Sequence, residues 1–144
     1  MEIKLKKGIG NLLFGMKEED VKGFMNTAPD KKYQDEDGNV IYLYNSDKLR
    51  LTFYKDEDYR LGYIITSKPD VLLFGEKIIG RNWDTVTPLL KKHGIKSFET
   101  DTIDTVETYF SEENWVVFQL EFGEIIKVEY GAMINSKDEF IWHY

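Results

Sequence analysis

The chain has 144 residues, with 26 acidic and 19 basic side chains and a net charge of −7. Its length fits one domain with one hydrophobic core, and its negative charge opposes direct binding to a nucleic-acid backbone while favouring a cationic protein partner. It contains no cysteine, which excludes disulfides, thiolate metal sites and a cysteine nucleophile.

No segment has the character of a targeting or membrane-spanning sequence. Residues 1–7 lack an apolar stretch of signal-peptide length, and the longest apolar runs elsewhere are too short to cross a bilayer. We therefore expect a cytoplasmic protein that does not contact a membrane.

The first half predicts one helix and three strands. Acidic residues 18–20 precede an apolar spacing of Val21, Phe24 and Met25, and Pro29 follows, which is typical of a short helix. Residues 40–45, 49–55 and 59–66 alternate with a period of two and are separated by turn-forming residues, which predicts a three-strand meander. Residues 30–39 read as a polar connector.

The second half predicts the same order of elements. A helix begins at Asn82 or Asp84 and ends before Gly94, which suits the left-handed position after a helix. Residues 105–110, 115–120 and 124–131 read as strands, and residues 97–104 as a polar connector. Residues 139–144 are expected to add an edge strand.

The two halves are related by a fixed offset of 65 positions, which pairs, for example, Val21 with Val86, Tyr44 with Tyr109 and Phe53 with Phe118. Chance matching between strand-rich segments is the other interpretation. The offset predicts an α+β fold in which tandem α-β-β-β repeats form one antiparallel sheet with the helices packed on one face. The repeats are expected at about 9–66 and 74–131 of a single domain, followed by a C-terminal segment 132–144.

Alternation along the predicted strands divides their side chains between two faces. The set that we assign to the core is Ile41, Leu43, Leu49, Leu51, Phe53, Leu61, Tyr63, Ile65, Val106, Phe110, Val116, Phe118, Leu120, Ile126, Val128 and Tyr130. The opposite set mixes aromatic and charged residues: Tyr42, Tyr44, Arg50, Thr52, Tyr54, Glu107, Tyr109, Trp115, Val117, Gln119, Lys127 and Glu129.

This second set predicts a partner-binding face, because Tyr, Trp and Arg are enriched at binding hot spots. Acidic turns at its rim would steer a basic partner. The residues that we expect to bind are Tyr42, Tyr44, Arg50, Tyr54, Asp56, Glu57, Asp58, Glu107, Tyr109, Glu112, Glu113, Trp115 and Gln119. Ordinary cross-strand packing, or the C-terminal segment lying over these residues, is the alternative interpretation.

Catalytic motifs are absent from the sequence. His93 and His143 are the only histidines, and neither lies in a nucleophile motif; we interpret His93 as structural, at a helix C-terminus. Residues 8–10 lack the pattern of a phosphate loop, and residues 35–39 lack the ligand series of a calcium loop. We expect no enzyme activity, no cofactor and no metal site.

Residues 13–21, Leu-Phe-Gly-Met-Lys-Glu-Glu-Asp-Val, carry a resemblance. With the tandem unit, the chain resembles the β-lactamase-inhibitor-protein-like architecture found in small bacterial proteins. These include immunity proteins of polymorphic toxin and contact-dependent growth inhibition systems. Lipoproteins of this architecture have a signal peptide and a lipidated cysteine, and the secreted inhibitors have disulfides. This chain has neither, which favours a cytoplasmic role.

The resemblance implies a monomeric immunity protein that binds and neutralises a cognate toxin. A basic nuclease domain is the target that the negative charge suits. The alternative is a non-catalytic scaffold or assembly subunit that self-associates through the same sheet face.

Overall fold

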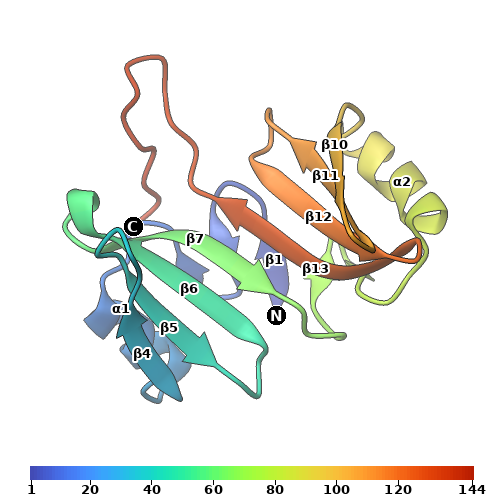
Figure 1. The fold of residues 1–144 in the computed structure, drawn as a ribbon. Helices are drawn as coiled ribbons and strands as arrows, with labels where there is room; N and C mark the ends of the chain where they lie inside the picture. The colour runs from blue at the N-terminus through green and yellow to red at the C-terminus, as the bar shows by residue number, and fades with distance from the viewer.

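The larger of two sheets forms the frame of the molecule (Figure 1). The computed structural model describes all 144 residues, and eight antiparallel strands follow one another in the order β10-β11-β12-β13-β7-β6-β5-β4. The first half of the chain supplies β4 (Lys31–Gln34), β5 (Val40–Tyr44), β6 (Leu49–Tyr54) and β7 (Arg60–Thr66). The second half supplies β10 (Glu99–Ile103), β11 (Val106–Ser111), β12 (Val116–Glu121) and β13 (Glu124–Gly131). The halves join where β7 pairs with β13.

A second sheet was not expected from the sequence. Its strands are short and lie in the order β3-β2-β1-β8-β9: β1 (Glu2–Lys4), β2 (Gly8–Ile9), β3 (Leu12–Leu13), β8 (Leu72–Leu73) and β9 (Glu76–Lys77). β1 and β8 are parallel, and the other pairs are antiparallel. Strands of two or three residues are too short to show a period of two, so the prediction of one sheet was incomplete.

Both predicted helices are confirmed, as α1 (Glu18–Met25) and α2 (Trp83–Lys92). At the start of α1, the Lys17 backbone N–H donates to the Asp20 carboxylate at 3.0 Å. The Asn82 side chain caps α2 by accepting from the Asp84 N–H at 2.9 Å. His93 ends α2 with its ring stacked on Phe74, 3.9 Å between centroids, a structural position. Neither helix is long and apolar enough to cross a membrane.

The edge strands of the large sheet differ from those predicted: both predicted connectors contain one, and residues 139–144 do not form one. β4 and β10 lie within residues 30–39 and 97–104 and pair with β5 and β11. Their side chains are mostly exposed on both faces, so hydrophobic alternation could not indicate them. Residues 139–144 form no strand and contribute only an isolated bridge between Ile134 and Phe140.

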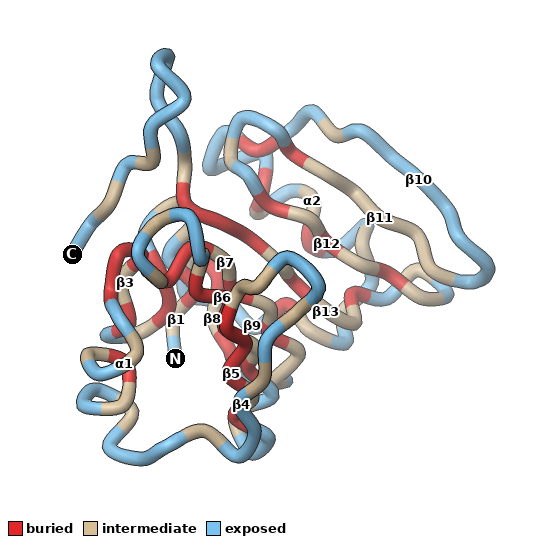
Figure 2. The backbone as a smooth tube through the Cα atoms, turned by 60° about the vertical axis from the view of Figure 1, so that its left-hand side comes forward, coloured by how far each residue is buried: buried red, intermediate tan, exposed pale blue.

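One face of the large sheet carries the core. Val21 of α1, Val86 of α2 and residues of the short-stranded sheet all belong to a single buried cluster with it. Between the helices, the Phe14 ring packs edge-on against Tyr130, and the Tyr130 hydroxyl donates to the Gly8 carbonyl at 2.9 Å. Figure 2 shows the buried segments concentrated along β5, β6, β7 and β13. The fold is therefore mostly sheet with two helices, in agreement with the α+β class.

The core prediction was right along β6 and β12 and at Leu61, Val128 and Tyr130, but two irregularities made it wrong at Tyr63, Ile65 and Ile126. Leu49, Leu51, Phe53, Val116, Phe118 and Leu120 are buried as expected. The pairing shifts by one residue between Thr52 and Phe53, and again between Gln119 and Leu120. Each shift reverses the faces that follow, so Ile64 and Ile125 enter the core in place of Ile65 and Ile126.

Candidate docking surface

The face of the large sheet turned away from the helices is called the outer face here. Residues paired directly across neighbouring strands point to the same face. Arg50 pairs with Leu43 and Ile65, and Gln119 pairs with Lys127, while none of these five residues belongs to the buried cluster. The expected outward positions of Arg50 and Gln119 are therefore confirmed, as is that of Tyr54, whose ring lies over Gly62.

Tyr42 and Tyr44 lie on the opposite face, in the core, which corrects their assignment to a binding surface. Both are almost completely buried. The Tyr42 hydroxyl donates to Glu18 of α1 at 2.6 Å, and the Tyr44 hydroxyl donates to the Thr27 carbonyl at 3.0 Å. Their pairing with Leu51 and Leu49 explains the placement, because those leucines face the core.

The same correction applies to Glu107 and Tyr109 of β11. They pair with Leu120 and Phe118, whose side chains point toward α2. The Tyr109 ring packs against Trp83, with centroids 4.5 Å apart, and its hydroxyl donates to Glu107 at 3.3 Å. Consequently Val106 and Phe110, predicted as core, alternate to the outer face.

At one end of the outer face, aromatic side chains surround a small apolar hollow, which we call the apolar notch. Its volume is about 140 Å³, and it is lined by Tyr54, Trp115, Ala132, Met133, Ile134 and Phe140. Trp115 is 39% exposed and Ile134 is 47% exposed. Phe140 lies 5.5 Å from the Tyr54 ring, and burial raises the pKa of Tyr54 to about 12. The C-terminal segment thus partly covers Tyr54 but leaves Trp115 accessible.

Glycine allows the rings of the notch to lie close to the sheet. A side chain at Gly62 would meet the Tyr54 ring at 2.1 Å, and one at Gly131 would meet Trp115 at 2.8 Å. Trp115 also packs edge-on against Phe110, 5.4 Å between centroids. These contacts fix the aromatic side chains in place, so binding would cost little of their conformational entropy.

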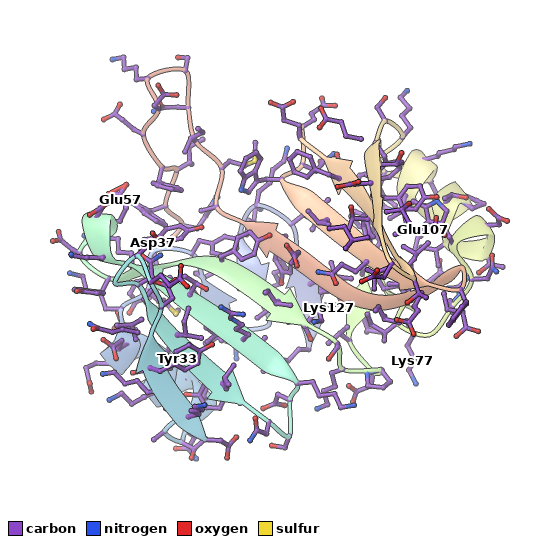
Figure 3. The ribbon with its side chains drawn as sticks, in the orientation of Figure 1. Tyr33, Asp37, Glu57, Lys77, Glu107 and Lys127 are labelled. Atoms are coloured by element: carbon purple, nitrogen blue, oxygen red, sulfur yellow. The ribbon has the colours of Figure 1, made fainter.

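An acidic groove adjoins the notch on the side of β6, and we call it the Asp37 groove. It has a volume of about 350 Å³ and is lined by Asp37, Asn39, Tyr54, Asp56, Glu57 and Phe140. Figure 3 shows Asp37 and Glu57 at the same end of the sheet, beside the C-terminal segment. Asp58 lies outside the lining and approaches Arg60 at 3.5 Å.

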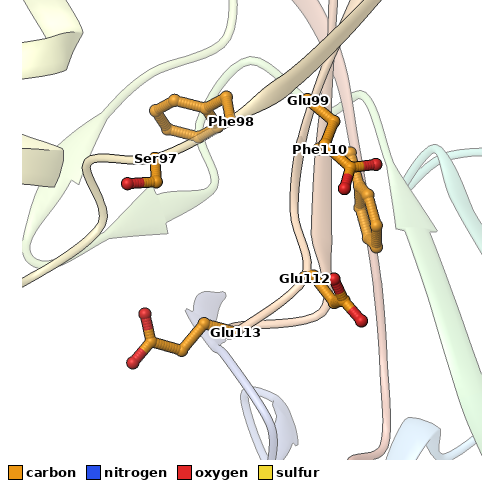
Figure 4. A pocket seen from close by; sticks show the side chains of 6 residues that line it. All are labelled: Ser97, Phe98, Glu99, Phe110, Glu112 and Glu113. Atoms are coloured by element: carbon orange, nitrogen blue, oxygen red, sulfur yellow. The ribbon is translucent and has the colours of Figure 1, made fainter.

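A second acidic groove, the Glu113 groove, lies on the side of β11. It has a volume of about 420 Å³ and is lined by Ser97, Phe98, Glu99, Phe110, Glu112 and Glu113. Figure 4 shows Glu99 and Glu112 on the side of Phe110, with Glu113 directed away from them. Phe110 connects this groove to the notch through its contact with Trp115.

The notch and the two grooves form one surface, called the docking surface below. Its apolar centre is flanked by six carboxylates, from Asp37, Asp56, Glu57, Glu99, Glu112 and Glu113. None of the six forms a salt bridge within the chain. Their charges therefore remain available to a cationic partner, and the predicted acidic turns at residues 56–57 and 112–113 lie on the same rim.

The docking surface includes residues that sequence reasoning did not select. Met133, Ile134 and Phe140 come from the C-terminal segment, and Asp37 comes from a turn. That turn is closed by Asp35, which accepts from the N–H groups of Asp37 and Asn39, with Gly38 at φ 83°. Residues 140–142, Phe-Ile-Trp, were a visible aromatic signal for a packed segment.

The arrangement offers contact area and charge, and it presents no group of side chains suited to hold a metal ion. Gln119 is engaged within the sheet, where it and the Tyr63 hydroxyl both donate to the Glu129 carboxylate. Burial, followed by the proximity of Glu129, raises the pKa of Tyr63 well above its ordinary value.

Comparison with known proteins identifies a fold. No protein family and no curated protein matches the sequence. The structure is similar to that of the uncharacterized protein YfeY from Escherichia coli, with a TM-score of 0.54 and 13% identity over 88% of this chain and 97% of that one. It is also similar to an extracellular protein containing a SCP domain from Bacillus anthracis, with a TM-score of 0.53 and 14% identity over 90% of this chain. This chain spans about half the length of the Bacillus protein.

Proposed function

We propose that the chain is a non-catalytic immunity protein that binds and neutralises a cognate toxin, with a basic nuclease domain as the target. The observation that carries the proposal is the apolar notch between two grooves with unpaired carboxylates. Binding interfaces commonly combine an apolar, aromatic centre with a polar rim. A nuclease presents a basic cleft to its substrate, and carboxylates can replace phosphates there.

The charge of the surface favours a different protein over a second copy of this chain. A symmetric dimer formed through the docking surface would place the same carboxylates of the two copies close together. Like charges repel strongly when they are taken out of water. The charges therefore count against the scaffold alternative, which self-associates through this same face. Sedimentation of the isolated protein tests it: a dimer that dissociates when Trp115 is replaced would favour the scaffold.

Binding to the product of the neighbouring gene upstream tests the proposal directly. We expect the protein to bind that product at low ionic strength and to abolish its activity. Replacing Trp115 by Ala should weaken binding by about 2 kcal/mol or more, because it empties the centre of the interface. Phe122→Ala is the matched control, since Phe122 is 81% exposed in the β12–β13 turn.

Two outcomes contradict the proposal. One is no detectable binding between the two gene products at low ionic strength. The other is tight binding that Trp115→Ala leaves unchanged while Phe122→Ala weakens it. Cell fractionation tests the cytoplasmic location, which the fold leaves open because the similar Bacillus protein is extracellular.

We also infer that the chain consists of two copies of one unit, as the 65-residue offset predicts. In each half, a pair of short antiparallel strands, β2–β3 or β8–β9, precedes a helix and four antiparallel strands, and the first half has β1 in addition. The central pairing supports this, because Tyr63 pairs with Gly131 and Thr66 with Val128. The 65-residue offset relates Tyr63 to Val128 and Thr66 to Gly131, so exchanging the two halves leaves this pairing unchanged. Expressing residues 74–131 alone would test whether one unit can self-associate through its exposed β13.

A further inference from the structure

A second hollow on the outer face differs in charge from the docking surface. It has a volume of about 310 Å³, lies at the other end of β6 from Tyr54, and includes Asn45, Lys48, Arg50, Ile65, Ser67 and Lys127 in its lining. Three of the lining side chains are cationic and none is anionic. Figure 3 shows Lys127 over the middle of the large sheet. A hollow with only positive charge is unexpected in a chain with a net charge of −7.

The positive charges of this hollow are not neutralised within the protein. Lys48, Arg50 and Lys127 form no salt bridge within the chain. Nearby carboxylates have other partners: Asp47 binds Lys68 at 3.2 Å, and Asp30 accepts from the Asn45 N–H at 2.7 Å. On the neighbouring strand, Glu129 accepts from Tyr63 and Gln119.

Arg50 supplies the second observation. Its Nε is the one buried side-chain nitrogen or oxygen in the chain that has no hydrogen-bond partner. Buried polar groups in folded proteins almost always have a partner, and an unpaired one requires an explanation. A guanidinium can only donate, and its planar array of N–H groups matches the paired oxygens of a carboxylate or a phosphate.

We propose that this hollow binds an oxyanion, the shared chemistry of phosphate and carboxylate groups. Arg50 donates in a forked geometry from its two terminal Nη groups, because its Nε is closed to solvent. Lys48 and Lys127 supply charge from the β5–β6 turn and from β13. The Ser67 hydroxyl and the Asn45 amide line the same hollow and add donors. The apolar side chain of Ile65 forms part of the wall. The site is separate from the docking surface and does not depend on the proposed immunity function.

Titration of the full chain with inorganic phosphate, and separately with acetate, tests the site by NMR. We expect saturable shifts at Arg50, Ser67 and Lys127 that sodium chloride at equal ionic strength does not reproduce. The anion, phosphate or acetate, that saturates the shifts at the lower concentration is the preferred ligand. Arg50→Lys keeps the charge and removes the fork, so the affinity should fall about tenfold, the effect of one charge-assisted hydrogen bond.

Lys127→Gln should weaken binding to a similar degree, since it removes one of the cationic side chains. Lys96→Gln is the matched control, because Lys96 is exposed in the loop after α2 and far along the chain from the hollow. Thermal unfolding provides a second readout: phosphate should raise the Tm of the parent protein and of Lys96→Gln more than that of Arg50→Lys. Binding that is equal in the parent and in Arg50→Lys would overturn the proposal, as would shifts that chloride reproduces.

Discussion

The hydrogen bond between Tyr42 and Glu18 joins the core of the sheet to the first turn of α1. Burial opposes ionisation of Glu18, but hydrogen bonds from Lys32 and Tyr42 prevail and hold the pKa of Glu18 below its ordinary value. A carboxylate with a lowered pKa stabilises the fold above its ordinary pKa, and this stability is lost as the pH falls through the folded-state value.

Tyr42→Phe should therefore lower the free energy of unfolding by about 1 kcal/mol at neutral pH and reduce its dependence on acid pH. Urea unfolding between neutral and acid pH measures both. Tyr44→Phe is the control, because its hydroxyl donates to a backbone carbonyl that does not titrate. It should cost similar stability and leave the acid dependence unchanged; equal acid dependence in both variants would refute the role of Glu18.

Gly62 provides a second prediction for a single residue. An added methyl group would overlap the Tyr54 ring at 2.1 Å, so Gly62→Ala should lower stability by about 1–3 kcal/mol and displace that ring. Gly23→Ala is the control in α1, where a methyl group meets nothing within 4 Å, and it should be neutral or stabilising by up to about 1 kcal/mol. Thermal unfolding of both variants decides; a neutral Gly62→Ala would show that Tyr54 is free to move.

The faces of individual residues could be predicted only where hydrophobic alternation is unambiguous. In β12, buried Val116, Phe118 and Leu120 alternate with partly exposed residues, and their assignment was right. In β5 almost every position is apolar and buried, so alternation did not show which of its residues face the core, and Tyr42 was placed on the wrong face. The missing information was the pairing of Tyr44 with Leu49 across the turn. Paired residues share a face, so this pairing determines which residues of both strands point to the core.

At the scale of elements, the C-terminal segment 132–144 is the part that the sequence described least well. It returns to the first half, where the His143 N–H donates to the Phe14 carbonyl at 3.0 Å. Its Phe140 ring lies between Tyr54 and Trp142. The segment makes tertiary contacts without a strand, so neither period nor propensity could place it. The alternative that it lies over the predicted face is right for Tyr54.

Phe140→Ala should expose Tyr54 and lower its pKa from about 12 toward the ordinary value of 10.0. Alkaline titration followed by ultraviolet absorbance should show one tyrosine ionising at lower pH than in the parent protein. The difference should vanish when Tyr54→Phe is present in both proteins. Ile141→Ala, at a position that is 44% exposed, serves as control and should leave the titration unchanged. An unaltered titration in Phe140→Ala would mean that another element buries Tyr54.

Edge strands and bulges mark the limit of prediction for the other elements. The helices were predicted correctly because acidic first turns and caps are local signals. β4 and β10 depend on a neighbouring strand for their hydrogen bonds, and their side chains carry almost no core signal. The extra residue is Gly62 in β7, opposite Thr52 and Phe53, and Ile126 in β13, opposite Gln119 and Leu120. A glycine inside a strand can mark a bulge, whereas Ile126 gives no such signal. The bulge at Gly62 turned Tyr63 and Ile65 outward.

For the whole molecule, the net charge of −7 indicated a basic partner but not where that partner binds. The fold collects six unpaired carboxylates around the apolar notch and three cationic side chains in the separate hollow at Arg50. This separation depends on which turns reach the same edge of the sheet. Turns distant in sequence, at residues 55–58 and 112–115, meet there because β7 and β13 are neighbours.

The carboxylates at the rim should act mainly on the rate of association with the proposed basic toxin. Rim charges steer the encounter, whereas buried contacts at the centre determine dissociation. Replacing Asp56, Glu57, Glu112 and Glu113 by their amides should lower the association rate by about tenfold at low salt and flatten its dependence on ionic strength. The dissociation rate should change less, in contrast to Trp115→Ala, which should raise it. Asp104→Asn with Glu124→Gln is the control at the opposite end of β11 and β13. Stopped-flow mixing over a range of salt concentrations measures the association rates. Equal rates and equal salt dependence in both sets of variants would refute the steering role.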